Sequence, residues 1–360
     1  FETILIIVRK VDENNRRSKK MAKNLDYANI GFAYHKTDKR FISYWKEGAW
    51  DAGCLSEDSN VVLNESAGIL QYCQQVFEGL KAYRWKDGSI VCFRPDMNAE
   101  RMFHSAEFLE MPGFPKDRFL EALDETVKAN VDWVPPFGSG ATLYIRPYEF
   151  ASGVVIGVKP ADEYTFRIFT TPVGPYFKGG AVPIALMISD FDRAAPHGTG
   201  AIKAGLNYAM SLHSHEIAVE KGFTENLYLD AGKREFVEET GGANVLFVDE
   251  KDRLVVPKSD SILPSITRKS LIYVAEDILH IPVEERAVRL EELKSFKECG
   301  LCGTAAVISP VGKIQNHEEE ICFPSGMEKP GKIMDELYRT LIAIQDGEME
   351  APEGWIRHIQ

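Results

Sequence analysis

Apolar residues follow strand-like and helical patterns in the first half of the chain. Aromatic and β-branched residues fill short runs that predict strands at residues 41–45, 80–85, 90–93, 142–148 and 166–170. Two helices are expected among these strands. The clearer one follows Pro115, with apolar residues at helical spacing until Pro135 and Pro136 stop it.

The second half repeats this mixture after residues 172–183, a stretch rich in glycine and proline. A strand is expected at residues 184–188 and a helix from about Asn207. The remaining expected elements are short strands near Leu227, Val245 and Val255, a helix from near Ser265, a strand at residues 305–309, and a terminal helix with Ile333, Leu337, Leu341 and Ile344 on one face.

Neither half alternates strands and helices regularly, so the pattern predicts two α/β (or α+β) domains rather than one doubly wound sheet. We assign residues 21–176 to a smaller N-terminal domain, residues 177–190 to a linker and residues 191–360 to a larger C-terminal domain. Residues 1–20 are expected to be an N-terminal extension, because their apolar run precedes their basic stretch, the reverse of a secretory signal. A cleft between two domains is a common place for a small-molecule site.

Composition and charge narrow the possible functions. The 360 residues carry 42 Lys and Arg against 54 Asp and Glu, a formal net charge of −12, which disfavours nucleic acid or an anionic membrane as a partner. Six cysteines are sparse in such a chain and fit a reducing cytoplasm. No glycine-rich nucleotide motif follows a strand. His213 and His215 fall on different helix faces, so no metal site is expected.

Cys299 and Cys302 have the spacing of a redox pair. Redox pairs of the thioredoxin type open a helix after a strand, whereas Gly303, Thr304 and a strand follow here. The pattern therefore favours structural thiols, with a thiol oxidoreductase as the weaker alternative.

Lys203 lies in the most informative segment, residues 197–208. Small residues and glycines flank it, which allows a bulky planar group to approach the backbone, and Tyr208 follows five positions later in the expected helix. A lysine that forms a Schiff base must lose its proton, which desolvation or nearby cations favour. From spacing alone, a surface lysine in a loop is equally compatible.

Three other segments suit a phosphorylated aldehyde cofactor. Residues 263–268 resemble a capped helix start, whose free N–H groups can bind phosphate. Residues 303–306 offer a hydroxyl and further backbone donors. Residues 238–244 place two carboxylates beside a glycine pair, where a buried one could hold a pyridinium proton; spacing alone favours a charged turn.

Most of the chain resembles the branched-chain amino acid aminotransferases, which are fold-type IV pyridoxal-phosphate enzymes with the D-amino acid aminotransferase-like fold. The resemblance begins near Asp26 and includes the run Phe77-Glu78-Gly79-Leu80-Lys81-Ala82. Its elements follow one another in the family's order, at residues 71–82, which include this run, and at residues 93–102, 143–147, 197–208, 239–244, 263–268 and 303–310. Each element is weak singly, and together in order they are specific.

The resemblance implies roles around pyridoxal 5'-phosphate. Lys203 looks like the lysine that binds the cofactor covalently and acts as the catalytic base, and Tyr208 would contact the phenolic oxygen. Glu239, rather than Glu238, matches the carboxylate that faces the pyridine nitrogen. The residues that match the phosphate site are Arg101, Ile266, Thr267 and Thr304, with Arg94 as the alternative arginine.

The resemblance also implies a substrate pocket and a dimer. Its aromatic wall would comprise Phe32, Tyr72, Phe77, Tyr144 and Tyr176. The backbone from Thr304 through Ala305 to Ala306 would hold the α-carboxylate, and Arg146 the distal carboxylate of glutamate. Tyr72, Ile156 and Val158 match residues that reach the partner subunit's site, so a homodimer is expected.

The activity implied is ping-pong transamination between L-leucine, L-isoleucine or L-valine and 2-oxoglutarate. Mammalian members carry a redox cysteine pair where Ala306 and Ser309 stand here, so thiol regulation is not expected. The alternatives are a D-amino acid aminotransferase or an aminodeoxychorismate-lyase-like enzyme, and, more distantly, a non-catalytic binding protein of the same fold.

Overall fold

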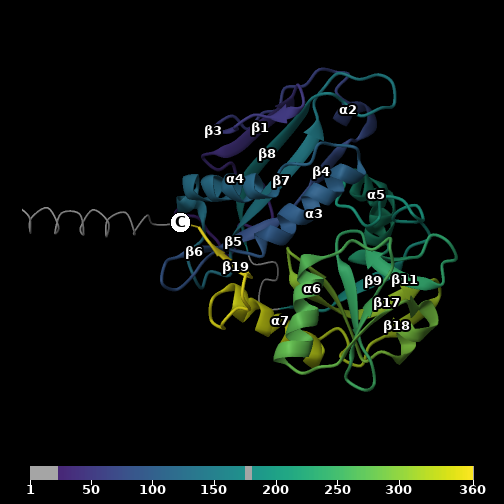
Figure 1. Cartoon of the computed structure of the whole chain (residues 1–360). Coiled ribbons are helices and arrows are strands. Elements are labelled where there is room, and N and C mark those ends of the chain that lie inside the picture. The colour runs from purple at the N-terminus through teal and green to yellow at the C-terminus, as the bar shows by residue number, and fades with distance from the viewer. Residues whose placement is uncertain (1–22, 175–180, 360) are drawn as a thin grey trace, which may run out of the picture.

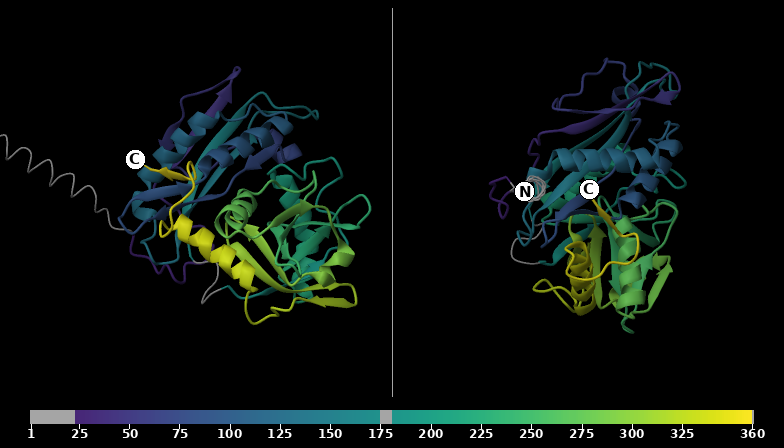
Figure 2. Two further views of the ribbon diagram at one scale, coloured as in Figure 1. Left: turned by 60° about the horizontal axis from the view of Figure 1, so that its bottom comes forward. Right: turned by 60° about the vertical axis from the view of Figure 1, so that its left-hand side comes forward.

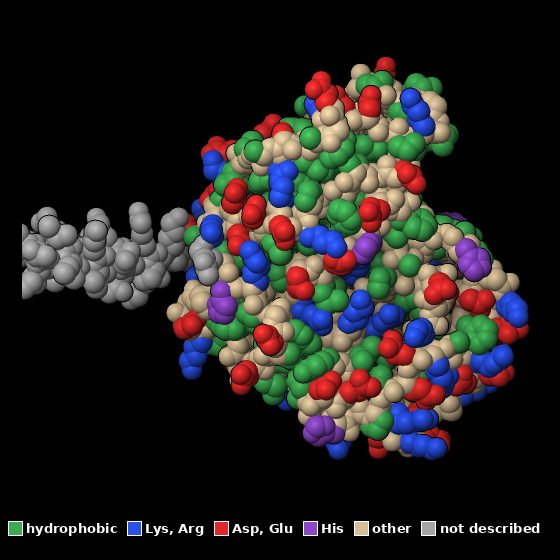
Figure 3. All heavy atoms as spheres, in the orientation of Figure 1, with side chains coloured by type: hydrophobic (Ala, Val, Ile, Leu, Met, Phe, Trp, Pro, Cys, Tyr) green, Lys and Arg blue, Asp and Glu red, His purple; other side chains and the backbone are tan. Residues whose placement is uncertain are grey.

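The structure is a computed structural model that describes residues 23–174 and 181–359. Two β-sheets form its two halves (Figure 1): the first from residues 40–173 together with residues 356–358, and the second from residues 184–322. The extension predicted for residues 1–20 lies outside the described residues. Acidic and basic side chains are interspersed over the face that Figure 3 shows. Within the described ranges, no helix combines the length and the apolarity that crossing a bilayer requires.

The first sheet has nine strands and carries helices on one face (Figure 2). Its strand order is β19-β6-β5-β7-β8-β1-β2, with β3 on β1 and β4 on β7. The strands are β1 (Arg40–Lys46), β2 (Ala49–Trp50), β3 (Cys54–Ser56), β4 (Gln75–Phe77), β5 (Leu80–Arg84), β6 (Ile90–Phe93), β7 (Thr142–Ala151), β8 (Tyr164–Val173) and β19 (Ile356–His358). The helical segments are α2 (Gly68–Tyr72), α3 (Pro95–Phe108), α4 (Lys116–Ala129) and the short 3₁₀ helix Val131–Trp133.

Apolar residues of α3 and α4 explain why these helices cover the sheet. Met102 and Leu123 are at most 1% exposed and pack in one core with Phe166 of β8. Phe114, between the helices, stacks on Phe166 with the ring centroids 3.8 Å apart. The burial of such side chains is worth roughly 1.5–3 kcal/mol each, which fixes α3 and α4 against the first sheet.

The second sheet has ten strands, six of which close into a barrel. The ring runs β12-β16-β17-β9-β10-β11, and β11 pairs back with β12 through Glu239 and Asn244. The strands are β9 (Ile184–Ile188), β10 (Glu225–Leu229), β11 (Phe236–Thr240), β12 (Asn244–Val248), β13 (Leu254–Pro257), β14 (Val283–Arg286), β15 (Val288–Arg289), β16 (Glu298–Gly303), β17 (Val307–Asn316) and β18 (Glu319–Cys322). The helical segments are α5 (Gly205–Glu220), α6 (Ile266–Tyr273), its π-helical continuation Val274–Ile278, the 3₁₀ helix Leu290–Ser295 and α7 (Lys332–Gln345).

The two halves are joined by the chain's last residues. After α7 the chain returns to the first sheet (Figure 2), where β19 pairs with β6. Trp355 packs beside Phe93 and α7 in a core that the two halves share. The predicted C-terminal domain, residues 191–360, therefore needs correcting at its end, and β9 is a barrel strand although the prediction placed it in the linker, residues 177–190.

Most strands and helices were predicted. The expected strands at residues 90–93 and 184–188 are β6 and β9, and the apolar face of the terminal helix is buried in α7. The strand expected at residues 305–309 was wrong at its start, since it begins at Val307, after a turn. Residues 238–239, for which spacing alone favoured a charged turn, lie in strand β11, because barrel closure pairs this strand with its neighbours.

Candidate active site

A cavity of about 220 Å³ lies where the barrel meets the first sheet, and Lys203 lines it. The two halves fix the lysine backbone together. Phe77 N of β4 donates to Lys203 O over 3.1 Å, and Lys203 N donates to Ser105 Oγ of α3 over 3.1 Å. The Gln75 side chain of β4 lies directly against Gly205 at the start of α5, so the two segments lie close together here.

Asn207, in the first turn of α5, fixes the loop before Lys203. Its Nδ2 donates to Thr199 O over 2.7 Å and to Ile202 O over 3.0 Å. Its Oδ1 accepts from Thr199 Oγ1 over 2.6 Å. A loop of small residues thus gains a defined geometry from one buried amide.

The lysine amine points at Tyr208. Lys203 Nζ donates to Tyr208 Oη over 2.7 Å and lies 4.8 Å from the ring centroid of Phe77. Tyr208 and Phe77 meet edge to face at 4.9 Å. The amine is therefore held by one hydroxyl and lies beside two aromatic rings. Lys203 also lines the cavity, so a bound group can reach the amine from there.

Glu239 lies buried at the point where the barrel closes. It is 3% exposed, and it accepts hydrogen bonds from Leu263 N over 2.8 Å and from Asn244 Nδ2 over 2.6 Å. Arg193 Nη2 lies 2.6 Å from Glu239 Oε1. Burial raises the pKa of Glu239 to about 7, although Arg193 acts to lower it.

Glu238 points elsewhere because side chains alternate along a strand. It accepts from Ser259 Oγ over 2.7 Å and does not line the cavity, whereas Glu239 does. The choice of Glu239 over Glu238 thus agrees with where the two side chains point.

The start of α6 forms another side of the cavity. Ser265 caps this helix by accepting from Arg268 N over 3.2 Å, and Ile266 lines the cavity. Thr267 follows in the first turn, buried but outside the lining. The N–H groups of this first turn have no partner within the helix, so they suit an anion.

Arg101, unlike Arg94, reaches the cavity. Two of its nitrogens donate to the carboxylate of Glu78 over 2.7 Å each, and Nη1 donates to Pro264 O over 3.1 Å. Arg94 instead stacks on Trp355 at 4.4 Å and donates to Ser270 Oγ.

The turn between β16 and β17 closes the cavity on the side of the second half. Gly303, Thr304 and Ala305 line it, whereas Ala306 lines a second cavity behind the turn. Ala305 contacts both cavities. This turn therefore separates the first cavity from the second.

Aromatic side chains and one arginine line the opposite side of the cavity. Phe32 and Tyr144 meet edge to face at 5.1 Å, and Arg146 Nη2 donates to Tyr144 Oη over 2.9 Å. Arg146 lies 4.8 Å over Phe77, and its buried Nε has no hydrogen-bond partner among the described residues. A methyl group at Gly79 would collide with the Tyr144 hydroxyl, so this wall requires glycine there.

Three predicted residues lie away from this chain's own cavity. The Tyr72 hydroxyl donates to Ile156 O, and the side chains of Tyr72, Ile156 and Val158 are 38%, 73% and 88% exposed. None of the three lines the cavity. Tyr176 lies outside the described residues.

The sequence analysis missed Arg193 and gave Asn244 no role. Arg193 also donates to Gly200 O over 2.7 Å and Ser261 O over 2.8 Å, so one guanidinium joins the lysine loop, the loop before α6 and Glu239. Ser261 and Glu239 lie far from Arg193 in the sequence. No local pattern around Arg193 signals them.

Cys299 and Cys302 lie on opposite faces of β16, since they are an odd number of residues apart. They belong to different apolar cores. Burial raises the pKa of Cys302 to about 12 and also raises the pKa of Cys299 well above its usual value. Their positions do not suit a redox pair.

Comparison with known proteins identifies the family of the chain. A model of the family "Amino-transferase class IV" matches residues 75–314. The branched-chain-amino-acid aminotransferase of Haemophilus influenzae is 49% identical over 343 residues, 94% of this chain and all of the relative.

Solved structures share the fold. The branched-chain amino acid aminotransferase of Escherichia coli is 27% identical with a TM-score of 0.76, covering 90% of this chain and all of its own. The branched-chain amino acid aminotransferase of Thermobaculum terrenum, solved in its PLP-form, is 24% identical with a TM-score of 0.75, over 91% of this chain and all of its own. The chain belongs to the class IV aminotransferase family and has its two-domain α/β fold.

Proposed function

We propose that this chain is a pyridoxal-phosphate-dependent branched-chain amino acid aminotransferase. It would transfer amino groups reversibly between L-leucine, L-isoleucine or L-valine and 2-oxoglutarate. The 49% identity to a branched-chain-amino-acid aminotransferase over nearly the whole chain supports this activity. The observation that carries the proposal is the amine of Lys203, held 2.7 Å from Tyr208 Oη in a cavity that buried Glu239 also lines.

The residues that line the cavity fit pyridoxal 5'-phosphate. A primary amine, a buried carboxylate and a helix N-terminus are the groups that its aldehyde, ring nitrogen and phosphate require. Side-chain space is open at Gly242, where an added Cβ would meet nothing within 4 Å. Ile266, Thr267 and Thr304 would hold the phosphate, and Arg101 would add its charge, since Glu78 fixes its guanidinium.

Pyridoxal phosphate, when bound, withdraws electrons from the substrate's Cα and so makes its proton acidic. Arg193 lowers the pKa of Glu239 and so favours its carboxylate form. This carboxylate would hold the proton on the ring nitrogen. Tyr208 Oη would hold the phenolic oxygen and orient Lys203. Lys203 Nζ would take the Cα proton of the amino acid as general base and give it up within the same half-reaction, at the carbon that carried the cofactor's aldehyde oxygen. With 2-oxoglutarate as substrate, it would move a proton in the opposite direction, onto Cα.

The aromatic wall suits branched aliphatic side chains. Phe32, Phe77 and Tyr144 offer apolar surface, and a difference of one methylene changes binding there by only ~1–3 kcal/mol. All three branched-chain amino acids should therefore be accepted. Arg146, with its unpaired buried Nε, would pair with the distal carboxylate of glutamate. The backbone of Thr304, Ala305 and Ala306 would hold the α-carboxylate.

A homodimer would complete the site. The side chains of Leu70, Tyr72, Val154, Ile156 and Val158 form an exposed apolar patch on α2 and the loop between β7 and β8. Exposed apolar patches of this kind commonly mark protein–protein contacts. A second copy covering this patch would receive Tyr72, Ile156 and Val158 at its own pocket. The cysteine content fits a cytoplasmic enzyme.

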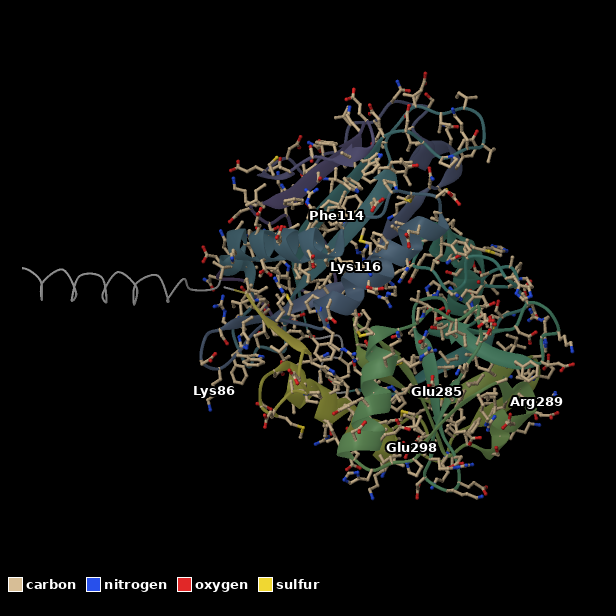
Figure 4. All side chains as sticks on the ribbon, viewed as in Figure 1. Lys86, Phe114, Lys116, Glu285, Arg289 and Glu298 are labelled. Atoms are coloured by element: carbon tan, nitrogen blue, oxygen red, sulfur yellow. The ribbon has the colours of Figure 1, made fainter. Side chains whose placement is uncertain are left out.

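The decisive experiment replaces the amine. Lys203→Ala should abolish turnover of L-leucine with 2-oxoglutarate and remove the visible absorbance of covalently held cofactor. Lys86→Ala, at an exposed turn (Figure 4), is the control and should keep activity and absorbance. A coloured, active Lys203→Ala variant would refute the proposal. Faster turnover of D-alanine or aminodeoxychorismate than of L-leucine would favour the alternative enzymes.

A further inference from the structure

A second cavity, of about 260 Å³, lies directly behind the turn that closes the active site. Ala305 lines both cavities, and Ala306 lines the second one. The second cavity is lined from the first sheet by Lys81 and Tyr83 and from the end of α7 by Gln345 and Asp346. A residue that contacts the turn from the second cavity can therefore influence the active site without lining it.

Lys81 makes that contact. Its Nζ donates to Ala305 O over 2.8 Å, from β5 of the first sheet to the turn of the barrel. The end of α7 is fixed beside it, because Trp85 Nε1, just after β5, donates to Gln345 O over 2.9 Å. The other arginine or lysine among the described lining residues, Arg84, is engaged instead with the carbonyls of Val131 and Val134.

The ammonium carries charge at neutral pH. Burial lowers the pKa of Lys81 to about 8, while Asp346 acts to raise it. Burial raises the pKa of Asp346 to about 6, and Lys81 acts to lower it. Each group thus favours the charged form of the other, so a cation faces Ala305 O near pH 7.

The planar peptide group transmits this charge toward the active site. No described peptide bond is cis, so the N–H of Ala306 points away from the Ala305 carbonyl to which it is joined. A carbonyl that accepts from an ammonium becomes more polarised, and its peptide N–H becomes a stronger donor. Lys81 lies behind the turn, so this N–H is directed away from the second cavity.

We propose that Lys81 is a positioning residue for the substrate's α-carboxylate, which it favours by polarising and fixing the Ala305–Ala306 peptide. The carboxylate would accept from this peptide's N–H without touching the lysine. The inference rests on the proposed function, in which the backbone of Thr304 to Ala306 holds the carboxylate. It adds a charged group, on the other half of the molecule, that selects for a carboxylate over a neutral group.

The test compares two ligands that differ only in charge at this position. The holoenzyme is titrated with 4-methylpentanoate and with its uncharged analogue 4-methylpentanamide, and the change in cofactor absorbance gives each Kd. In Lys81→Met, which keeps the stem and removes the charge, we expect the preference for carboxylate over amide to fall roughly tenfold. KM for L-leucine should rise by a similar factor, with kcat changed far less.

Three further variants separate charge from structure. Lys81→Arg keeps a cation and should retain most of the preference. Lys81→Gln keeps a donor for Ala305 O without charge and should lose most of it, which tests the idea even where Lys81→Met fails to fold. Lys86→Met removes an exposed lysine and should change nothing.

An unchanged preference in both Lys81→Gln and Lys81→Met would overturn the proposal. Equal weakening of the carboxylate and the amide would do so too, because it would indicate a purely structural role. Failure of the proposed function is recognised separately: the unmodified enzyme would then not turn over L-leucine at all.

Discussion

The ion pair of Arg193 and Glu239 allows a quantitative test of how far an arginine limits the rise in the pKa of a buried carboxyl. The side chains are 6% and 4% exposed and 2.6 Å apart. For such a pair, Coulomb's law at an effective dielectric constant of about 20 gives an attraction of roughly 4 kcal/mol. That corresponds to about three pKa units. Because burial has already raised the pKa of Glu239 to about 7, loss of Arg193 should leave this carboxyl protonated at neutral pH.

The sign of the pH dependence follows from linkage. A carboxyl whose pKa is higher in the folded protein than in the unfolded chain makes folding less favourable as pH rises through that interval. With Arg193 present, Glu239 no longer changes the free energy of unfolding once the pH is above its pKa of about 7. In Arg193→Met the pKa of Glu239 is higher, so the pH interval over which the free energy of unfolding falls extends further upward. The variant should therefore lose roughly 1.4 kcal/mol more stability for each additional pH unit above neutrality.

The assay is urea unfolding of the cofactor-free protein at a fixed protein concentration, at about pH 6 and about pH 8.5. Arg193→Met should cost clearly more at the higher pH. In the Glu239→Gln background the same substitution should cost the same at both values, because no carboxyl remains to titrate. If the cost of Arg193→Met is independent of pH in the unmodified background, or the pair couples by less than about 0.5 kcal/mol in the double-mutant cycle, the ion pair is not what tunes Glu239.

Three further outcomes are expected. Burial raises the pKa of Glu149 to about 8, so this carboxyl should make the free energy of unfolding fall as pH rises from about 4.5 to 8. Glu149→Gln, which keeps an acceptor for Phe114 N, should reduce the slope in that interval by roughly 1.4 kcal/mol per pH unit; an unchanged slope contradicts this. Glu298 accepts from Ile333 N and Met334 N at the start of α7 (Figure 4), so Glu298→Ala should lower the free energy of unfolding by ~1–3 kcal/mol and Glu298→Gln by less; equal losses in a urea titration would show that capping is not the cause. Gly79→Ala should raise KM for L-leucine, since its methyl collides with the Tyr144 hydroxyl, while cofactor absorbance stays unchanged; an unchanged KM would show that this wall adapts.

Elements with a local cause were predictable from sequence. The terminal helix α7 has a single apolar face, and Ser265 is a helix cap, so short-range spacing was enough for each. Lys203 was recognised as a candidate through its small neighbours, and the structure gives it a defined partner in Tyr208.

Features that depend on pairing across the fold were not predictable. Strand β11 contains Glu238 and Glu239, and two adjacent carboxylates indicate a turn unless a neighbour buries one of them. Barrel closure supplies that neighbour through Asn244. β19 consists of three residues and is a strand only because β6 offers it an edge. Arg193 has no pattern of its own, since its three acceptors lie on three separate loops and strands.

The position of Lys203 shows why the active site needs both halves of the molecule. Its peptide is bound by Phe77 of β4 and Ser105 of α3, whereas its side chain lies beside Tyr208 of α5. A shift between the two halves would move the backbone of Lys203 relative to the carboxylate of Glu239, which lies on β11 of the barrel. The same reasoning applies to Lys81, which spans the two halves from behind the turn. Contacts between the halves therefore set the distance between the base and the groups that bind the substrate, and a substitution at either contact should alter catalysis before it alters the fold.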